Sequence, residues 1–232
     1  MAKKKSTKKS KSTGRQIIQV DIVSDVVCPW CWLGVRYFQK AAKQSKHDVR
    51  LTWRPYMLDP EVPAGGVPYQ EYMDKKFGSD GPSDRFKTMR DALEEAGPTV
   101  AIDFKFNNIP IRPNTLDAHR LIKWAQGQGL GDAASEALFQ AFFTDSKDIG
   151  NPATLSDIAQ EIGMDSDLTA ELLAGEDDKN AVREEILFFR NLGINGVPCF
   201  IYNGQFAVQG AQPAAAHIKA IEQAANLPSD NT

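Results

Sequence analysis

The motif CPWC at residues 28–31 constrains this 232-residue chain most, because it stands between two segments of clear periodicity. Residues 17–23 alternate in polarity and are rich in β-branched side chains, which predicts a strand. Residues 33–42 carry apolar side chains at helical spacing, and residues 49–53 alternate again. The order strand, CxxC, helix, strand indicates the start of a βαβ unit.

The segment after residue 58 is rich in Pro and Gly and breaks this pattern. The spacing is then mostly helical, with one segment at 102–106 that looks extended. A longer helix is expected over 178–192, and two apolar runs then flank Asn203-Gly204, a strong signal for a β-hairpin. A last helix covers about 214–225.

Without its helical middle the chain has the element order of a thioredoxin fold. We therefore predict an α/β protein with a thioredoxin-like fold and an inserted all-helical domain. The predicted organisation is a disordered basic tail at 1–15, a first thioredoxin-like segment at 16–58, the helical insertion at 59–177, a second thioredoxin-like segment at 178–226, and a short tail at 227–232.

The net charge of −3 is unevenly distributed along the chain. Seven of the 27 basic residues lie among the first 15, which hold no acid, so the rest carries 20 basic against 30 acidic residues. A body this acidic argues against nucleic-acid binding. The basic tail is low in complexity and is expected to be disordered, either as an electrostatic tether or as a solubilising segment.

The sequence shows no secretory signal and no apolar run near the roughly 18 residues that a membrane span needs. We therefore expect a cytoplasmic protein that makes no use of a membrane. In a reducing compartment, a close Cys pair favours catalysis, redox sensing or metal binding over a structural disulfide.

The spacing of Cys28 and Cys31 suits disulfide exchange. Cys28 falls at the strand end and the helix start, where free N–H groups and the helix dipole favour a thiolate. Cys31 lies about one turn inside, so we expect Cys28 to be the exposed nucleophile and Cys31 the more buried resolving thiol. Pro29 suits the first helical position. Trp30 either packs against a substrate or shields the helix start.

A metal site is the main rival for a CxxC motif. A structural zinc ion needs four ligands, but the remaining Cys199 and the three histidines, His47, His119 and His217, show no paired spacing. We therefore predict no metal.

A second signal is Gly196-Val197-Pro198, just before the hairpin. Proline lacks a ladder donor and is confined to strand edges and first positions. Taken alone, these residues predict a junction between a loop and a strand.

Three segments together resemble the DsbA-like, FrnE-type oxidoreductases: SDVVCPWCWLG (24–34), RPNTLDAHRLIKWA (112–125) and GINGVPCFIYNGQFAVQGAQP (193–213). The resemblance extends over roughly residues 16–226. It implies a thioredoxin fold with a helical insert, a catalytic pair Cys28 and Cys31, and a cis Pro198 that faces this pair. The backbone of Val197 would then pair with an extended substrate.

Cys199 departs from the pattern of this family. It is either a small buried strand residue or a third thiol that modulates the pair. Kappa-class glutathione transferases and 2-hydroxychromene-2-carboxylate isomerases are a neighbouring branch of the fold that this resemblance implies. They carry Ser at the position of Cys28. By this resemblance Arg112, Asn114, His119 and the turn 210–212 are candidates for lining a glutathione-sized cleft. His119 is equally compatible with packing at a domain interface.

We predict a thiol–disulfide oxidoreductase that acts on protein or small thiols, with no bound cofactor and with glutathione as a candidate co-substrate. The alternative is a glutathione-dependent isomerase or transferase. A third hypothesis is a holdase that binds partners through the insert. The sequence leaves the redox direction and the oligomeric state, a dimer among the options, open.

Overall fold

A computed structural model describes residues 17–78 and 84–228 of the chain. The predicted tail at 1–15 and the last residues, 229–232, lie outside the described residues. The elements are β1 (Ile17–Ser24), α1 (Pro29–Gln44), β2 (Asp48–Pro55), β3 (Val67–Pro68), α2 (Tyr69–Phe77), α3 (Asp84–Ala96), the 3-10 turns η1 (Gly97–Val100) and η2 (Phe106–Asn108), β4 (Ile111–Arg112), α4 (Leu116–Gly127), α5 (Gly131–Phe143), α6 (Pro152–Glu161), α7 (Ser166–Ala174), α8 (Lys179–Asn191), β5 (Cys199–Tyr202), β6 (Phe206–Gln209) and α9 (Ala214–Asn226).

The main sheet has four strands in the order β2-β1-β5-β6. β1 pairs in parallel with β2 and antiparallel with β5, and β6 closes the hairpin predicted around Asn203-Gly204. Asn203 and Gly204 have positive φ values of 49° and 69° and lie at the centre of a turn that the Gln205 N–H closes on the Tyr202 carbonyl at 2.9 Å. The predicted α/β, thioredoxin-like fold is confirmed.

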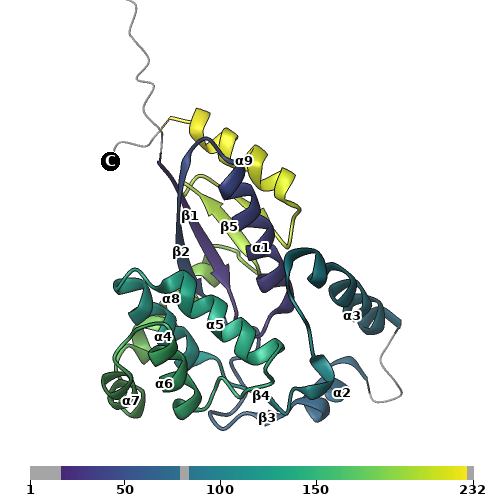
Figure 1. The fold of residues 1–232 in the computed structure, drawn as a ribbon, viewed down its shortest axis with the longest axis vertical. Coiled ribbons are helices and arrows are strands. Elements are labelled where there is room, and N and C mark those ends of the chain that lie inside the picture. The colour runs from purple at the N-terminus through teal and green to yellow at the C-terminus, as the bar shows by residue number, and fades with distance from the viewer. Residues whose placement is uncertain (1–16, 79–83, 229–232) are drawn as a thin grey trace, which may run out of the picture.

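Helices cover both faces of this sheet (Figure 1). On one face α1 packs against α9, and Phe38 of α1 stacks on Phe200 of β5 at 5.3 Å between ring centroids. On the other face Phe189 of α8 packs with Val23 and Cys199. Consecutive strand residues point to opposite faces, which explains why the neighbours Cys199 and Phe200 join different clusters.

The segment between β2 and α8 is mostly helical, as predicted, but it is not all-helical. Val67 pairs with Arg112 and Pro68 with Ile111 in a short antiparallel ladder. Two-residue strands are too short to show alternation, so no sequence pattern indicated them. A Cβ at Gly66, which has a φ of +72°, would lie 2.5 Å from the Ile111 side chain, so the ladder depends on this glycine. The stretch 102–106, expected to be extended, joins no strand.

Indole hydrogen bonds fasten the insert to the thioredoxin-like core. Trp32 Nε1 of α1 donates to Glu136 of α5 at 3.2 Å, and Trp53 Nε1 of β2 donates to Asp132 at 2.7 Å. The Trp32 ring also stacks on Phe139 at 5.9 Å. These contacts fix α5 against the helix that carries the Cys pair. Within the described residues, no helix combines the length and the apolar character that a membrane crossing would need.

Candidate active site

The two cysteines of the motif lie at the first turn of α1. Cys28 is the N-cap residue, with extended backbone angles of −99° and 111°, and Pro29 follows at the start of the helix. The Cys28 N–H donates to the Asp25 carbonyl at 3.0 Å, so a tight turn leads from β1 into the helix. Both cysteines are free thiols. Cys28 therefore lies at the N-terminus of α1, where the first backbone N–H groups have no partner within the helix.

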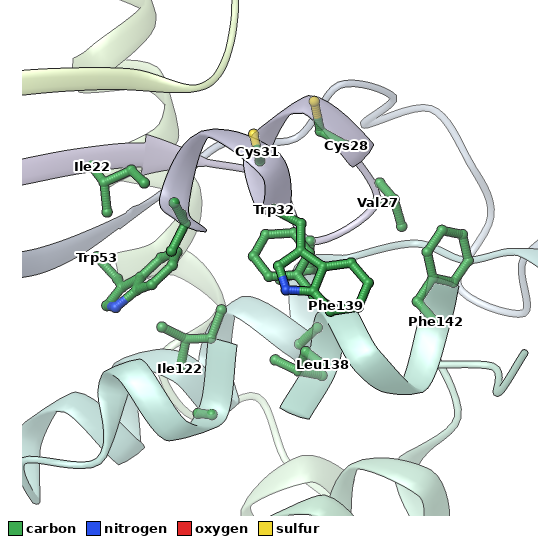
Figure 2. Close-up of a cluster of buried hydrophobic side chains, with 14 of the residues drawn as sticks. Ile22, Val27, Cys28, Cys31, Trp32, Trp53, Ile122, Leu138, Phe139 and Phe142 are labelled. Carbon is green, nitrogen blue, oxygen red and sulfur yellow. The ribbon is translucent and has the colours of Figure 1, made fainter. Parts of the chain in front are cut away.

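The two thiols lie in different surroundings. Cys31 is fully buried, and burial raises the pKa of its thiol well above the ordinary value, an effect that Cys28 strengthens and Ser24 opposes. Cys28 is only 5% exposed, so the prediction that its thiol is exposed at the surface is wrong, and the sulfur borders a cavity instead. Figure 2 shows both sulfurs on the side of the first helical turn that faces away from Trp32 and Phe139. The structure thus gives Cys31 the interior position predicted for a resolving thiol.

The segment Val197-Pro198 lies against this turn. The Cys28 thiol points at the Val197 carbonyl oxygen at 3.8 Å. The Val197-Pro198 peptide bond is cis. A Cβ at Gly34 would lie 2.9 Å from the Pro198 ring, so this glycine lets α1 approach the proline closely. Cys28 and Val197, which are 169 positions apart in the chain, are thereby brought together.

A cavity of about 310 Å³ opens beside Cys28. Val27, Pro29, Trp30, Gly196 and Val197 line it close to the Cys28 sulfur. Leu58 adds to the wall, and the other lining residues come from the insert: Tyr69, Tyr72, Met73, Lys76, Phe77, Met89, Arg90, Leu93, Phe106, Arg112 and Phe143. A ligand in the cavity would therefore contact both the thioredoxin-like core and the insert, as well as the Cys28 thiol.

A charged network borders the cavity. Asp59 accepts from Lys76 at 2.6 Å and forms an ion pair with the largely buried Arg112. Partial burial works against ionisation of Asp59, but Lys76, Tyr72 and Arg112 outweigh it and lower the pKa of this carboxyl. Arg112 also donates to the Val27 carbonyl at 3.1 Å. Arg112 is thus held next to the redox motif by a carboxylate and a backbone oxygen.

His119 does not join the lining of this cavity. It is buried, and its Nε2 lies 2.8 Å from the Tyr56 carbonyl and 3.5 Å from Asp25 Oδ1. It borders a separate hollow of about 80 Å³ that Ser24 and Glu185 also line. Of the cleft candidates named from the sequence, Arg112 reaches the Cys28 cavity, whereas Asn114 binds the Val62 carbonyl instead.

Asp25 is a site neighbour that sequence reasoning did not single out. It is 1% exposed, and its Oδ2 accepts from the Leu58 N–H at 2.8 Å. Its Oδ1 has no hydrogen-bond partner within the stretches of chain that the structure describes. Its position three residues before Cys28 could have indicated that it lies near the site. An aspartate just before a helix is usually interpreted as a capping residue, however.

Cys199 lies apart from the Cys pair. It is fully buried and packs with Val23, Tyr56, Phe189 and Ile194 on the α8 side of the sheet. Burial raises the pKa of its thiol. The structure therefore does not bring the candidate third thiol to the site, and its surroundings match those of a small buried strand residue.

A family model described as a DSBA-like thioredoxin domain matches residues 19–222. The probable DsbA oxidoreductase SCO1869 from Streptomyces coelicolor has a structure similar to this chain. It is 25% identical, with a TM-score of 0.83 and 93% of each chain covered.

Two more distant structures share the fold. A 2-hydroxychromene-2-carboxylate isomerase is 15% identical, with a TM-score of 0.62 over 89% of this chain and 94% of its own. The cytosolic disulfide reductase DsbM from Pseudomonas aeruginosa, solved with GSH, is 17% identical, with a TM-score of 0.61 over 90% of this chain and 100% of its own. Because the family model spans most of the sequence and agrees with the fold around the Cys pair, this chain belongs to the family of DSBA-like thioredoxin domains.

Proposed function

We propose that this protein exchanges disulfides with thiol-containing substrates through Cys28 and Cys31. The observation that carries the proposal is the unequal pair at the start of α1. One thiol borders a cavity, and the other is buried one turn inside the helix. Attack by a thiolate on a disulfide needs a sulfur that the substrate can reach, here through the cavity, and a second thiol nearby to release the product.

The reaction balances with the residues present. The Cys28 thiolate attacks one sulfur of a substrate disulfide, that S–S bond breaks, and half of the substrate leaves as a thiolate. Cys31 then attacks the Cys28 sulfur, the second half leaves, and the Cys31 proton passes to a departing thiolate. Two electrons move from the dithiol to the substrate. The reverse sequence oxidises a substrate dithiol.

The neighbours of the pair have roles in this proposal. Trp30 and Pro29 line the cavity beside the sulfur and contact the bound substrate. The Val197 carbonyl, held next to Cys28 by the turn at Pro198, orients the thiol and the substrate backbone. His119 acts indirectly, because it contacts the Asp25 carboxylate below the site rather than the cavity.

Single substitutions test the proposal. Cys28→Ser should abolish exchange with a disulfide substrate, whereas Cys31→Ser should still attack and accumulate a mixed disulfide at Cys28, visible as an added mass. Cys199→Ser is the matched control, because that thiol packs in a separate cluster and should leave the exchange rate unchanged. Full activity in Cys28→Ser would refute the proposal.

The alternative, a glutathione-dependent isomerase or transferase, predicts a different outcome. Saturable glutathione binding and turnover of a small aromatic substrate would then persist in Cys31→Ser, because no resolving thiol is needed. Glutathione as a co-substrate, a cytoplasmic location and a dimeric state remain predictions. Titration of the Cys pair against a glutathione redox buffer would set the direction of exchange.

A further inference from the structure

The attacking thiol is poorly accessible from the surface of the protein. Cys28 is 5% exposed, and its sulfur points at the Val197 carbonyl oxygen. The cavity beside it is walled by α1 and the segment 196–197 on one side and by α2 and α3 of the insert on the other. A disulfide on the surface of a folded protein would have to pass between these walls, whereas a small molecule fits inside the cavity.

The lining of the cavity is predominantly apolar. Leu93, Phe106 and Phe143 form its buried base, each less than 9% exposed. Met73 and Met89 add flexible, polarisable side chains that adapt to an apolar ligand. A cavity of about 310 Å³ is at the lower end of the size range of small-molecule sites. This lining favours an aromatic or branched hydrocarbon group over a polar peptide.

The charges at the cavity are unbalanced. Lys76, Arg90 and Arg112 line it, and no acidic residue does so among the residues that the structure describes. Lys76 and Arg112 share one carboxylate, Asp59, while Arg90 pairs with Glu94 at 3.1 Å. Three cations and two carboxylates leave one net positive charge at the wall. A single anionic group on the ligand would neutralise it.

Building on the disulfide exchange proposed above, we propose that the substrate is a low-molecular-weight disulfide whose sulfur carries an apolar, aromatic-sized group with one carboxylate. The apolar group occupies the cavity, the carboxylate lies near Arg90 and Lys76, and the sulfur faces Cys28. The Cys28 thiolate forms a new S–S bond to that sulfur and the other half departs as a thiolate. Cys31 then closes the Cys28–Cys31 disulfide and releases the second half.

A panel of disulfides tests the substrate class in single turnovers. The pre-reduced protein is mixed with bis(4-carboxyphenyl) disulfide, its uncharged carboxamide analogue, glutathione disulfide or insulin. Samples are quenched with acid and alkylated, and the remaining thiols are counted by mass spectrometry. Each rate is divided by the rate of the same disulfide with 2-mercaptoethanol, which removes the intrinsic reactivity of the leaving group.

The aryl carboxylate should give a normalised rate about tenfold above glutathione disulfide, with insulin lowest, because burial of an aromatic group in an apolar site is worth at least this much. Equal or faster oxidation by insulin or glutathione disulfide would overturn the inference while leaving the exchange activity intact. If no disulfide oxidises the pair, the proposed function itself fails. The two failures are therefore distinguishable.

Charge variants test the anion site. Arg90→Gln and Lys76→Gln should each lower the ratio of carboxylate to carboxamide rates about threefold, as loss of one partly exposed charge contact would. Arg183→Gln is the matched control, because Arg183 is exposed on α8 and bonds to Asn180 of the same helix. An unchanged ratio in both cavity variants, or equal slowing of both substrates, would overturn the assignment of the carboxylate.

Discussion

Arg120 of α4 is a fully buried charge in the insert, and its substitution gives a sharp test of how the insert is held together. The side chain is fully buried, and its Nη1 pairs with Asp117 at 2.8 Å. It also lies over the ring of Trp124 at 4.9 Å. The guanidinium donates to four backbone carbonyls at and after the end of α7, those of Leu172, Leu173, Gly175 and Asp177. One side chain therefore binds two carbonyls of the last turn of α7 and two carbonyls just beyond it.

Arg120→Met keeps the aliphatic stem but removes the side-chain donor from these carbonyls, of which that of Leu172 retains the Gly175 N–H as a donor. Removal of one side of a buried charged network typically costs about 3–5 kcal/mol, and we expect a loss of that size. For a chain of this length the melting temperature would fall by about 10 °C. Arg120→Lys should recover some of the loss, because an ammonium has three donors where the guanidinium has five.

Urea unfolding followed by circular dichroism measures this loss. Lys123→Met is the matched control on the same helix, since Lys123 is about 40% exposed and lies 3.9 Å from Asp178. We expect that control to stay within about 0.5 kcal/mol of the unsubstituted protein. A loss below about 1 kcal/mol in Arg120→Met would show that water replaces the guanidinium and would refute the reasoning.

Three further predictions concern buried groups. Burial lowers the pKa of His217 to about 4, against about 6.5 in an unfolded chain. The stability that the neutral imidazole contributes is therefore complete above pH 6.5 and is lost as the pH falls toward 4, by up to about 3 kcal/mol. Urea midpoints between pH 7 and pH 4.5 should therefore fall less steeply in His217→Gln. Cys31 should resist iodoacetamide at pH 8 in a Cys28→Ser background until the chain unfolds, as mass spectrometry would show; modification of folded protein would contradict its burial. Trp53→Phe, which removes the bond to Asp132, should cost about 1–2 kcal/mol in thermal unfolding, and an unchanged melting temperature would mean that this bond contributes nothing.

Local patterns predicted the elements around the redox motif well. The alternation in 17–23 and the apolar spacing in 33–42 correspond to β1 and α1, because both elements bury one face against the same core. The β3–β4 ladder was missed, since its two-residue strands follow from the fold of the insert rather than from their own sequence. The segment 102–106 looked extended because its apolar side chains alternate, yet Ile102 and Phe104 are buried against the core without a partner strand.

The candidate site also has a part that the sequence predicted and a part that it did not. The motif CPWC lies within one turn of chain, so the roles expected for Cys28 and Cys31 followed from the spacing and from the helix start. Consecutive strand residues point to opposite faces of the sheet, so the direction of Cys199 depends on the face that Phe200 occupies. The sequence does not show which face this is; in the structure Phe200 stacks on Phe38 of α1, and Cys199 points to the opposite face. His119 and Asp25 lie far apart in the sequence, and no local pattern shows that the fold brings them together. The sequence therefore could not show that His119 contacts Asp25 instead of lining the cavity.

The exposure of the attacking sulfur shows most clearly what the sequence could not reveal. A cysteine at a helix N-terminus is expected to face solvent, because nothing in its own segment covers it. Here Cys28 is 5% exposed, and α2 and α3 contribute Met73 and Arg90 to the wall of the cavity beside it. These residues carry no motif, and their shared surface arises from packing of the insert over the thioredoxin-like core. The insert therefore forms part of the wall of the cavity beside a thiol that α1 and Val197 position.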